Sequence, residues 1–175
     1  MPGIIIHENP WFTVLDRDGY FTIEYSSPQV IVLPVVDENW IVTVRVKRPV
    51  LHDSPYEIPA GGVLEGETLN QAASRELKEE TGIEINDLSR FIKMPDLFNS
   101  PNRDPQPLDV FRVSLTLEEY ERRLPHDLEI ATVSLFSFDE LVEMIVTGDL
   151  YVSASIAVIA RYLLSLKKEK GRMHG

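Results

Sequence analysis

Three glutamates close together on one expected helix are the residues of this chain best placed to hold a metal ion. Glu76, Glu79 and Glu80 fall in a segment, 68–81, whose apolar residues repeat with helical spacing. On a helical wheel of about 100° per residue, the apolar stripe is formed by Leu69, Ala72, Ala73 and Leu77. Glu76 and Glu80 lie within this stripe and Glu79 lies at its edge. The three carboxylates are therefore expected to point inward together.

This inward position is unfavourable for acidic side chains unless a cation lies among them. Like charges three or four residues apart on a helix repel one another, and partial burial increases the cost. Mg²⁺ prefers oxygen ligands and is commonly held by a few carboxylates, water molecules and substrate phosphates. The pattern therefore predicts a divalent-metal site suited to phosphate chemistry. The alternative is an acidic helix face neutralised by neighbouring Arg and Lys side chains.

The ends of this helix are marked in the sequence. Thr68 and Gln71 are spaced as a capping box, and Gly82 stands where a glycine often ends a helix. The segment 49–66 before it contains several Pro and Gly residues and predicts a loop. The side of the helix expected to face water carries Asn70, Ser74, Lys78 and Thr81.

The rest of the chain predicts strands interleaved with helices. Val30–Val36 and Trp40–Val46 flank a turn and form a predicted hairpin, and residues 11–25 predict a smaller N-terminal hairpin. The other predicted elements are strands at 109–115 and 132–138 and helices at 117–123, 139–146 and 155–166. This order predicts an α/β or α+β sandwich. The proline-containing segment 94–108 predicts a long loop, which in a compact domain usually has a function.

Length and composition predict one acidic domain. The chain has 175 residues, 43% of them hydrophobic, which is enough for one well-filled core. Its formal net charge of -11 disfavours nucleic acid and anionic membranes as partners, and an anionic substrate would need local cations. The absence of cysteine excludes disulfides and thiolate metal sites. Neither a signal peptide nor a membrane span is recognisable, so a cytoplasmic protein is expected.

The spacing of residues around the glutamates resembles the signature of the Nudix family. That signature is Gly, five residues, Glu, seven residues, Arg-Glu-aliphatic, one residue, Glu-Glu, one residue, Gly-aliphatic. The string GGVLEGETLNQAASRELKEETGI, which begins at Gly61 and ends at Ile83, matches it at every position. A chance match in a chain of this length has a probability on the order of one in ten million.

The resemblance implies a fold and a metal-binding apparatus. The fold is an α/β/α sandwich with a mixed central sheet, here with a small N-terminal β-hairpin region. The family's ligands of the catalytic Mg²⁺, for which Mn²⁺ is the alternative, correspond to Glu76, Glu79 and Glu80. Arg75 is expected to position this cluster and Glu67 to support it. A backbone carbonyl just before the box, from Ala60 or Gly61, is expected to add a further ligand.

Segments outside the box resemble one branch of the family, the hydrolases of ADP-ribose and nucleotide sugars. These segments are Asn9–Trp11, Val46–Pro49, Glu57–Gly62 and the closing stretch from Phe138 through Ala157. The resemblance implies hydrolysis of ADP-ribose or a related nucleotide sugar to a nucleoside monophosphate and a sugar phosphate.

Several residues near these segments are candidates for binding the substrate. Arg45 and Arg48, at the end of a predicted strand, could neutralise phosphate oxygens, and Glu57 is included as a further contact. The segment 100–107 departs from the pattern of the ADP-ribose branch, and Arg103 within it could meet a terminal ribose or phosphate. The aromatic side chains that could stack on a base are Tyr56, Trp40 and Phe98.

The general base is expected outside the box. Family members that hydrolyse ADP-ribose often take it from a mobile loop, which corresponds here to residues 126–130. Glu129 is the first candidate and Asp127 the second. The alternative is a box glutamate, Glu79.

Other functions and an assembly follow from the same resemblance. Hydrolysis of dinucleoside polyphosphates or nucleoside triphosphates is one alternative, and a Nudix module that senses a ligand without turnover is another, although such modules typically lose box glutamates. Similar proteins are usually homodimers whose N-terminal hairpin crosses to the partner. The expected organisation is a dimerisation region at 1–27, a hydrolase domain at 28–166 and a charged tail at 167–175.

Overall fold

A mixed seven-stranded sheet forms the centre of the computed structural model, which describes residues 2–172, with side chains to residue 169. Its strands are β4 (Gln29–Val36), β5 (Trp40–Val46), β6 (Tyr56–Glu57), β7 (Ala60–Gly62), β8 (Phe91–Lys93), β9 (Leu108–Leu115) and β10 (Ile130–Ser137). The spatial order is β10, β5, β4, β9, β8, while β6 pairs with β5 and β7 with β4. The β4–β9 pair is parallel, and the remaining pairs are antiparallel.

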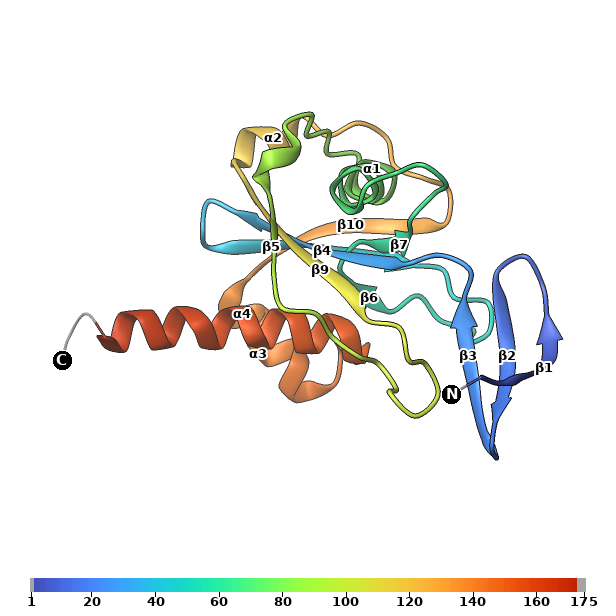
Figure 1. Ribbon diagram of the computed structural model, residues 1–175. Coiled ribbons are helices and arrows are strands. Elements are labelled where there is room, and N and C mark those ends of the chain that lie inside the picture. Colours follow the sequence, from blue (N-terminus) through green and yellow to red (C-terminus); the bar gives the residue numbers. More distant parts are fainter. Residues whose placement is uncertain (1, 173–175) are drawn as a thin grey trace.

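Helices cover both faces of this sheet. They are α1 (Leu69–Thr81), α2 (Leu117–Glu121), α3 (Phe138–Thr147) and α4 (Ser153–Arg172), with a short 3₁₀ turn, η1, at Leu88–Arg90. Figure 1 shows α1 and α2 on one face and α3 and α4 on the other. The predicted sandwich of helices around a mixed sheet is confirmed. Within residues 2–172, no helix is both long and apolar enough to cross a membrane.

Strand β4 contributes to two hydrophobic cores because successive side chains of a strand point to opposite faces. Val30, Val32 and Val36 pack in one core with Ala72, Ala73 and Leu77 of α1. Ile31, Leu33 and Val35 pack in the other with Leu141 of α3 and Val158 and Ile159 of α4. Burial on both faces explains why the sequence of β4 is almost continuously apolar.

The predicted hairpin and helix ends are confirmed. β4 and β5 are antiparallel and joined at Asp37 and Glu38, whose φ angles of 45° and 54° are left-handed. The capping box between Thr68 and Gln71 is formed at the start of α1. Gly82 ends the helix with φ 76°, and a β-carbon there would lie 1.8 Å from the carbonyl oxygen of Leu124. Glycine is therefore required both by conformation and by space.

The expectation that α1 turns Asn70 and Thr81 to water is wrong. Thr81 is fully buried, and its hydroxyl donates to the carbonyl of Leu77 at 2.5 Å. The amide of Asn70 donates to the carbonyls of Leu88 and Phe91, at 3.2 and 3.1 Å. The chain after Gly82 therefore folds back along the helix and covers a side that helical periodicity alone assigned to solvent.

The last helix is longer than its sequence predicts. α4 begins at Ser153 and continues to Arg172, past the predicted end at 166, so residues 167–172 of the predicted tail are helical. Residues 173–175 of that tail lie outside the described part of the chain. The short strands β6, β7 and β8 were not predicted, because each depends on a partner strand rather than on its own pattern.

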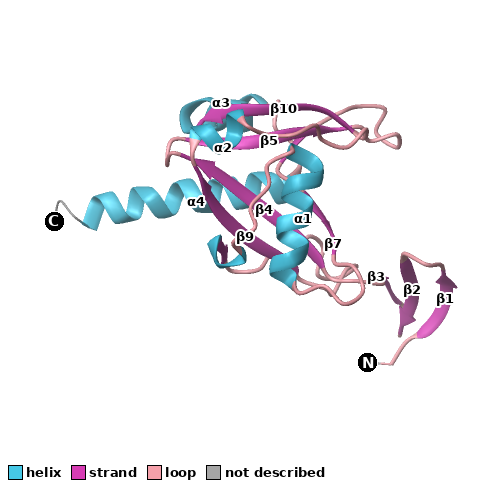
Figure 2. Cartoon of the chain, turned by 90° about the horizontal axis from the view of Figure 1, so that it is seen from above, coloured by secondary structure: helices cyan, strands magenta, loops and turns pink. Residues whose placement is uncertain are grey.

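A separate three-stranded sheet precedes β4. It consists of β1 (Ile4–Glu8), β2 (Phe12–Arg17) and β3 (Tyr20–Tyr25), so the predicted N-terminal hairpin carries an additional strand. Figures 1 and 2 place it beyond one end of the main sheet. The segment 26–28, which contains the predicted domain boundary, connects the two. The exposed apolar side chains of this N-terminal sheet include Ile4, Ile5, Ile6, Trp11, Tyr20 and Phe21.

Candidate active site

Helix α1 buries two of the three glutamates that it carries. Glu76 and Glu80 retain only 8% and 5% of their exposure, whereas the side chain of Glu79 remains 41% exposed. Their positions follow from the helical period, because residues four apart share one face. The structure thus gives each glutamate the degree of burial that the helical wheel predicts.

Arg75 connects these glutamates to the preceding loop. Its Nη1 donates to Glu76 and Glu79 at 2.7 and 2.8 Å, and its Nε donates to Glu67 at 2.8 Å. Its Nη2 donates to the carbonyl of Gly62 at 2.6 Å. The hydrogen bond from Arg75 lowers the pKa of Glu67. Arg75 therefore fixes the carboxylates relative to the strand that carries Gly61 and Gly62.

Glu80 has much less compensation for its charge. Its carboxylate accepts one hydrogen bond from the backbone, from the amide of Ala60 at 3.3 Å. Burial, followed by the negative charge of Glu76, raises the pKa of Glu80 to about 8. Burial also raises the pKa of Glu76, despite the opposing effect of Arg75. The pair is thus a buried acidic site in which a cation would be strongly stabilised.

The backbone of Gly61 lies very close to the carboxylate of Glu76. A β-carbon added to Gly61 would lie 2.1 Å from Oε1 of Glu76, so backbone and carboxylate approach each other closely only at a glycine. Carboxylate and backbone oxygens are the donors that Mg²⁺ prefers, and these residues fit such an ion in chemistry. In this structure the carboxylates of Glu76 and Glu79 are turned to Arg75. Within the described residues, no three acidic or histidine side chains are arranged around one point that could hold a metal ion.

Arg48 and Glu57 form the second charged element. The guanidinium of Arg48 donates to both carboxylate oxygens of Glu57, at 2.8 and 2.9 Å. This hydrogen bonding raises the pKa of Arg48, and the charges of Glu80 and Glu129 contribute in the same direction. Both side chains line a cavity of about 420 Å³ that also contains Ala60 and Gly61. The cavity therefore connects the ion pair to the backbone that lies against Glu76.

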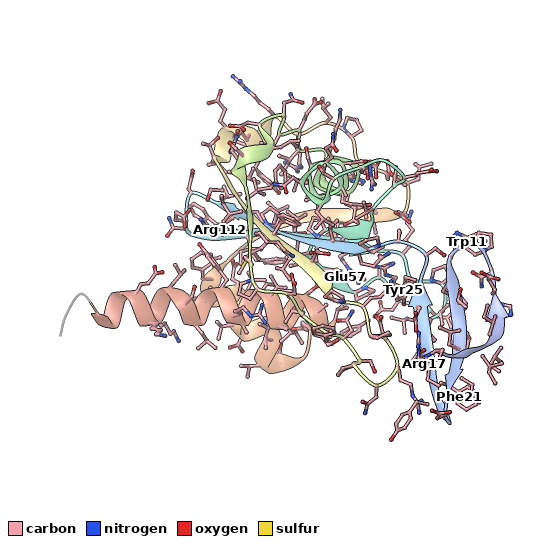
Figure 3. The ribbon with its side chains drawn as sticks, in the orientation of Figure 1. Trp11, Arg17, Phe21, Tyr25, Glu57 and Arg112 are labelled. Carbon is pink, nitrogen blue, oxygen red and sulfur yellow. The ribbon has the colours of Figure 1, made fainter. Side chains whose placement is uncertain are left out.

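Two distant segments complete the walls of this cavity. Ser153 and Ala154 at the start of α4 line it, and the hydroxyl of Ser155 accepts a hydrogen bond from the amide of Ile58 at 3.1 Å. Figure 3 shows Tyr25 near Glu57 where the N-terminal sheet approaches the main sheet, and both residues line the cavity. Tyr25 was missed in the sequence because the predicted hairpin gave no indication of its neighbours.

Arg45 lies elsewhere. It shares a face of β5 with Ile41, whereas Val44 and Val46 point to the opposite face. Its Nε donates to the carbonyl of Ser54 at 2.6 Å, and its guanidinium lies 5.1 Å from the ring centre of Tyr56. Arg45 and Tyr56 line a second cavity, of about 540 Å³. The structure therefore separates Arg45 from Arg48.

The other predicted contacts are also placed outside the cavity. Arg103 donates through Nη1 to the carbonyl of Phe21 at 3.0 Å, while Asp104 and Gln106 of the same loop line the cavity. Among the aromatic candidates, Trp40 packs against the core beside α1, and Phe98 is 54% exposed. None of the three predicted aromatic residues contributes to the cavity wall within residues 2–172.

Both candidates for the general base lie in a loop that contacts α1. The amide of Asp127 donates to the carbonyl of Glu79 at 2.8 Å, and the carbonyl of Glu129 accepts from the amide of Lys47 at 3.0 Å. The charge of Glu129 also acts on Arg48. The loop is thus attached between the glutamate helix and the end of β5.

Comparison with known proteins agrees with this geometry. Residues 26–155 match the model of the NUDIX domain. An ADP-ribose pyrophosphatase of Bacillus subtilis is 32% identical over 135 residues, covering 77% of this chain and 70% of that protein. A methanol dehydrogenase activator of Bacillus methanolicus is 30% identical over 131 residues, covering 74% and 69%.

The chain is also similar to one further known sequence and to a solved structure. An NAD-capped RNA hydrolase of Vibrio vulnificus is 29% identical over 136 residues, and this chain spans about half of its length, 48%. The crystal structure of an ADP compounds hydrolase superposes with a TM-score of 0.67 at 18% identity, covering 97% of this chain and 94% of that one. At this identity the likeness concerns the fold.

Proposed function

The chain belongs to the Nudix hydrolase family, and on that premise we propose that it cleaves the pyrophosphate linkage of ADP-ribose or a related nucleotide sugar. The products are a nucleoside monophosphate and a sugar phosphate. The observation that carries the proposal is the cavity that joins Gly61, beside the carboxylate of Glu76, to the Arg48–Glu57 pair. The 32% identity to an ADP-ribose pyrophosphatase supports the substrate class.

The box glutamates are the proposed metal ligands. Glu76, Glu79 and Glu80 would hold the ion, together with a carbonyl from Ala60 or Gly61, once Glu76 and Glu79 turn away from Arg75. Bound Mg²⁺ supplies positive charge that offsets the charge developing on the diphosphate and makes a bound water more acidic. Arg75 remains bonded to Glu67 and Gly62, so it keeps the start of α1 in place.

Arg48 is the proposed phosphate-binding cation of the chain itself. Glu57 holds its Nε and Nη2, and Nη1 has no hydrogen bond within the described residues, which leaves it for a phosphate oxygen. The first turn of α4 adds the backbone N–H groups of Ser153 and Ala154, which have no hydrogen-bond partner within residues 2–172, to the cavity wall. Both features favour an anionic substrate in an otherwise acidic protein.

Proton transfer is assigned to the loop at 126–130. A water molecule attacks phosphorus, the bridging P–O bond breaks, and the leaving phosphate takes the electron pair. Glu129 accepts the proton of that water, with Asp127 or Glu79 as the alternatives. The bond of Asp127 to α1 and the proximity of Glu129 to Arg48 support a base from this loop.

The N-terminal sheet is the proposed dimerisation element. Ile4 and Trp11 are each 72% exposed, and Tyr20 is 64% exposed. An apolar surface of this kind on a small sheet favours burial against a second copy of the chain. Analytical ultracentrifugation should show a homodimer, which Trp11→Ser combined with Ile4→Ser should weaken.

A substrate panel tests the proposed reaction. Phosphate release coupled to phosphatase is measured with ADP-ribose, sugar nucleotides, dinucleoside polyphosphates and nucleoside triphosphates, in Mg²⁺ and in EDTA. We expect turnover of ADP-ribose or a sugar nucleotide only with the metal. Preference for a polyphosphate would replace the substrate class, and no turnover of any compound would favour a ligand-sensing module.

A further inference from the structure

The loop between β8 and β9 occupies the free edge of β3. The amide of Ile23 donates to the carbonyl of Arg103 at 2.6 Å, and Nη1 of Arg103 donates to the carbonyl of Phe21 at 3.0 Å. Two residues farther along β3, Tyr25 is bound by Gln106. Since alternate residues of an edge strand direct their backbone groups outward, residues 21, 23 and 25 are the outward-facing set, and the loop forms a hydrogen bond with each of them.

Gln106 makes the most complete of these contacts. Its Oε1 accepts from the amide of Tyr25 at 2.8 Å, and its Nε2 donates to the carbonyl of Tyr25 at 3.1 Å. The side-chain amide has both a donor and an acceptor, so it replaces the peptide group of a missing neighbouring strand. Gln106 thereby joins the N-terminal sheet to the main domain.

Hydrogen bonds within the loop fold it into a turn at residues 100–106. The amides of Arg103 and Asp104 both donate to the carbonyl of Ser100 at 2.7 Å. The carboxylate of Asp104 accepts from the amide of Gln106 at 3.1 Å. The position of the Gln106 side chain is therefore set by a folded turn.

Tyr25 and Gln106 both line the cavity that contains Arg48 and Glu57. No β ladder joins the N-terminal sheet to the main sheet within the described residues. Apart from the connecting segment 26–28, the position of Tyr25 relative to Arg48 depends on the loop contacts. A shift of β3 would change the shape of this wall without moving the glutamates of α1.

We propose that Gln106 is a positioning residue that holds Tyr25 in the wall of the substrate cavity and so sets substrate affinity. The inference rests on the proposed function, because it assigns the cavity to the substrate. Gln106 acts through Tyr25, whereas the glutamates of α1 act on the reaction itself. Removing the Gln106 side chain is therefore expected to raise KM and to leave kcat unchanged.

The test compares Gln106→Ala and Gln106→Glu with Asn102→Ala. The glutamate keeps the size of the side chain but removes the donor to Tyr25. Asn102 is an exposed residue of the same loop and makes no hydrogen bond to β3 within the described residues. Both Gln106 variants should raise KM for the substrate that the wild type hydrolyses by about tenfold, because Gln106→Ala loses both hydrogen bonds to Tyr25 and Gln106→Glu loses one and sets a carboxylate against the carbonyl of Tyr25. Their kcat should stay within about twofold, and Asn102→Ala should match the wild type.

Hydrogen exchange provides a measurement that does not depend on activity. Protection of the amides of Ile23 and Tyr25 should fall in Gln106→Ala while protection in α1 is unchanged. In the background of Tyr25→Ala, which itself raises KM, Gln106→Ala should add little, because the two residues act in series.

The possible results separate this inference from the proposed function. Unchanged KM in Gln106→Ala, or a loss confined to kcat, overturns the positioning role. Additive effects of Gln106→Ala and Tyr25→Ala also overturn it. If the wild type hydrolyses no compound of the panel, the proposed function fails and the role in affinity fails with it. If the wild type is active and exchange at Tyr25 is unaffected in Gln106→Ala, only the present inference fails.

Discussion

Gly61 and Glu76 fit together only because residue 61 has no side chain, since a β-carbon there would lie 2.1 Å from Oε1 of Glu76. The neighbouring Gly62 is different: its β-carbon would meet the side-chain ends of Ser27 and Gln29 at 3.2 and 3.3 Å, which can move aside. The close approach to Glu76 therefore requires a glycine at position 61, whereas the neighbours of Gly62 can adjust. Replacing each glycine in turn distinguishes these two situations.

Gly61→Ala should displace the carboxylate of Glu76 and distort the proposed metal site. We expect kcat to fall by about 100-fold, as for a displacement of about 1 Å in an active site, and the free energy of unfolding to fall by about 2 kcal/mol through overpacking. Gly62→Ala is the matched control and should have much smaller effects on both. Steady-state kinetics and urea unfolding measure them, and wild-type activity in Gly61→Ala would contradict the role of this close approach.

Glu80→Gln should separate metal binding from folding. Because Glu80 is buried with little compensation, a neutral amide is less costly to bury, and the melting temperature in EDTA should equal or exceed that of the wild type. With Mg²⁺, the wild type should gain stability while the variant gains less, and kcat should fall on the order of 1000-fold. Glu84→Gln, which changes an exposed acid paired with Lys78, is the control. Equal stabilisation of both variants by Mg²⁺ would remove Glu80 from the ligand set.

The local part of the site could be predicted from the sequence. The inward position of Glu76 and Glu80 and the ends of α1 depend on residues near one another in the chain, so helical period and cap chemistry suffice. The box also fixes the spacing between Glu67 and Arg75, which form an ion pair at 2.8 Å. These features depend on one helix and the turn before it.

The walls of the cavity could not be predicted in this way. Arg45 and Arg48 look equivalent in the sequence, but Arg48 lies beyond the end of β5, so the periodicity of that strand does not place its side chain. The bonds between Tyr25 and Gln106 join residues 81 positions apart, and their pairing leaves no periodic pattern in either segment. Tertiary contacts of this kind decide which polar residues reach the substrate.

Substitutions of Arg48 and Arg45 are expected to change the kinetics differently. Arg48→Lys loses the two-point bond to Glu57, so KM should rise by about tenfold or more, as expected for a charged hydrogen bond. Arg45→Lys should leave KM within about twofold, because Arg45 bonds Ser54 and lines the other cavity. Initial rates over a range of substrate concentrations measure both. A rise in KM with Arg45→Lys alone would show that the substrate uses the second cavity, which Arg45 lines.

The ion pair of Arg90 and Glu119 predicts a pH dependence of stability. Their atoms lie 2.6 Å apart, and hydrogen bonding from Arg90 lowers the pKa of Glu119 from 4.5 to about 2. The stabilisation is therefore present above about pH 4.5 and disappears as the pH falls towards 2. Because both side chains are about one-third exposed, screening limits the effect of Glu119→Gln to about 1 kcal/mol at pH 7.

Urea unfolding at several pH values measures this dependence. The difference between wild type and Glu119→Gln should shrink below pH 4, whereas Glu118→Gln, in a more exposed pair with Arg122, should change little at any pH. A difference that stays constant down to pH 2 would mean that Glu119 contributes through its helix cap at Thr116 instead.

The assignment of the general base can be tested against the metal ligands. Glu129→Gln should lower kcat by about 100-fold while Mg²⁺ still raises the melting temperature as in the wild type, because Glu129 lies on a loop outside α1. Asp127→Asn should have a small effect, since the contact of Asp127 with Glu79 uses its backbone amide and is retained in the variant. The acidic limb of the pH profile of kcat should disappear in Glu129→Gln alone. If the limb persists there and is lost in Asp127→Asn, Asp127 takes the proton, and if it persists in both, Glu79 becomes the base.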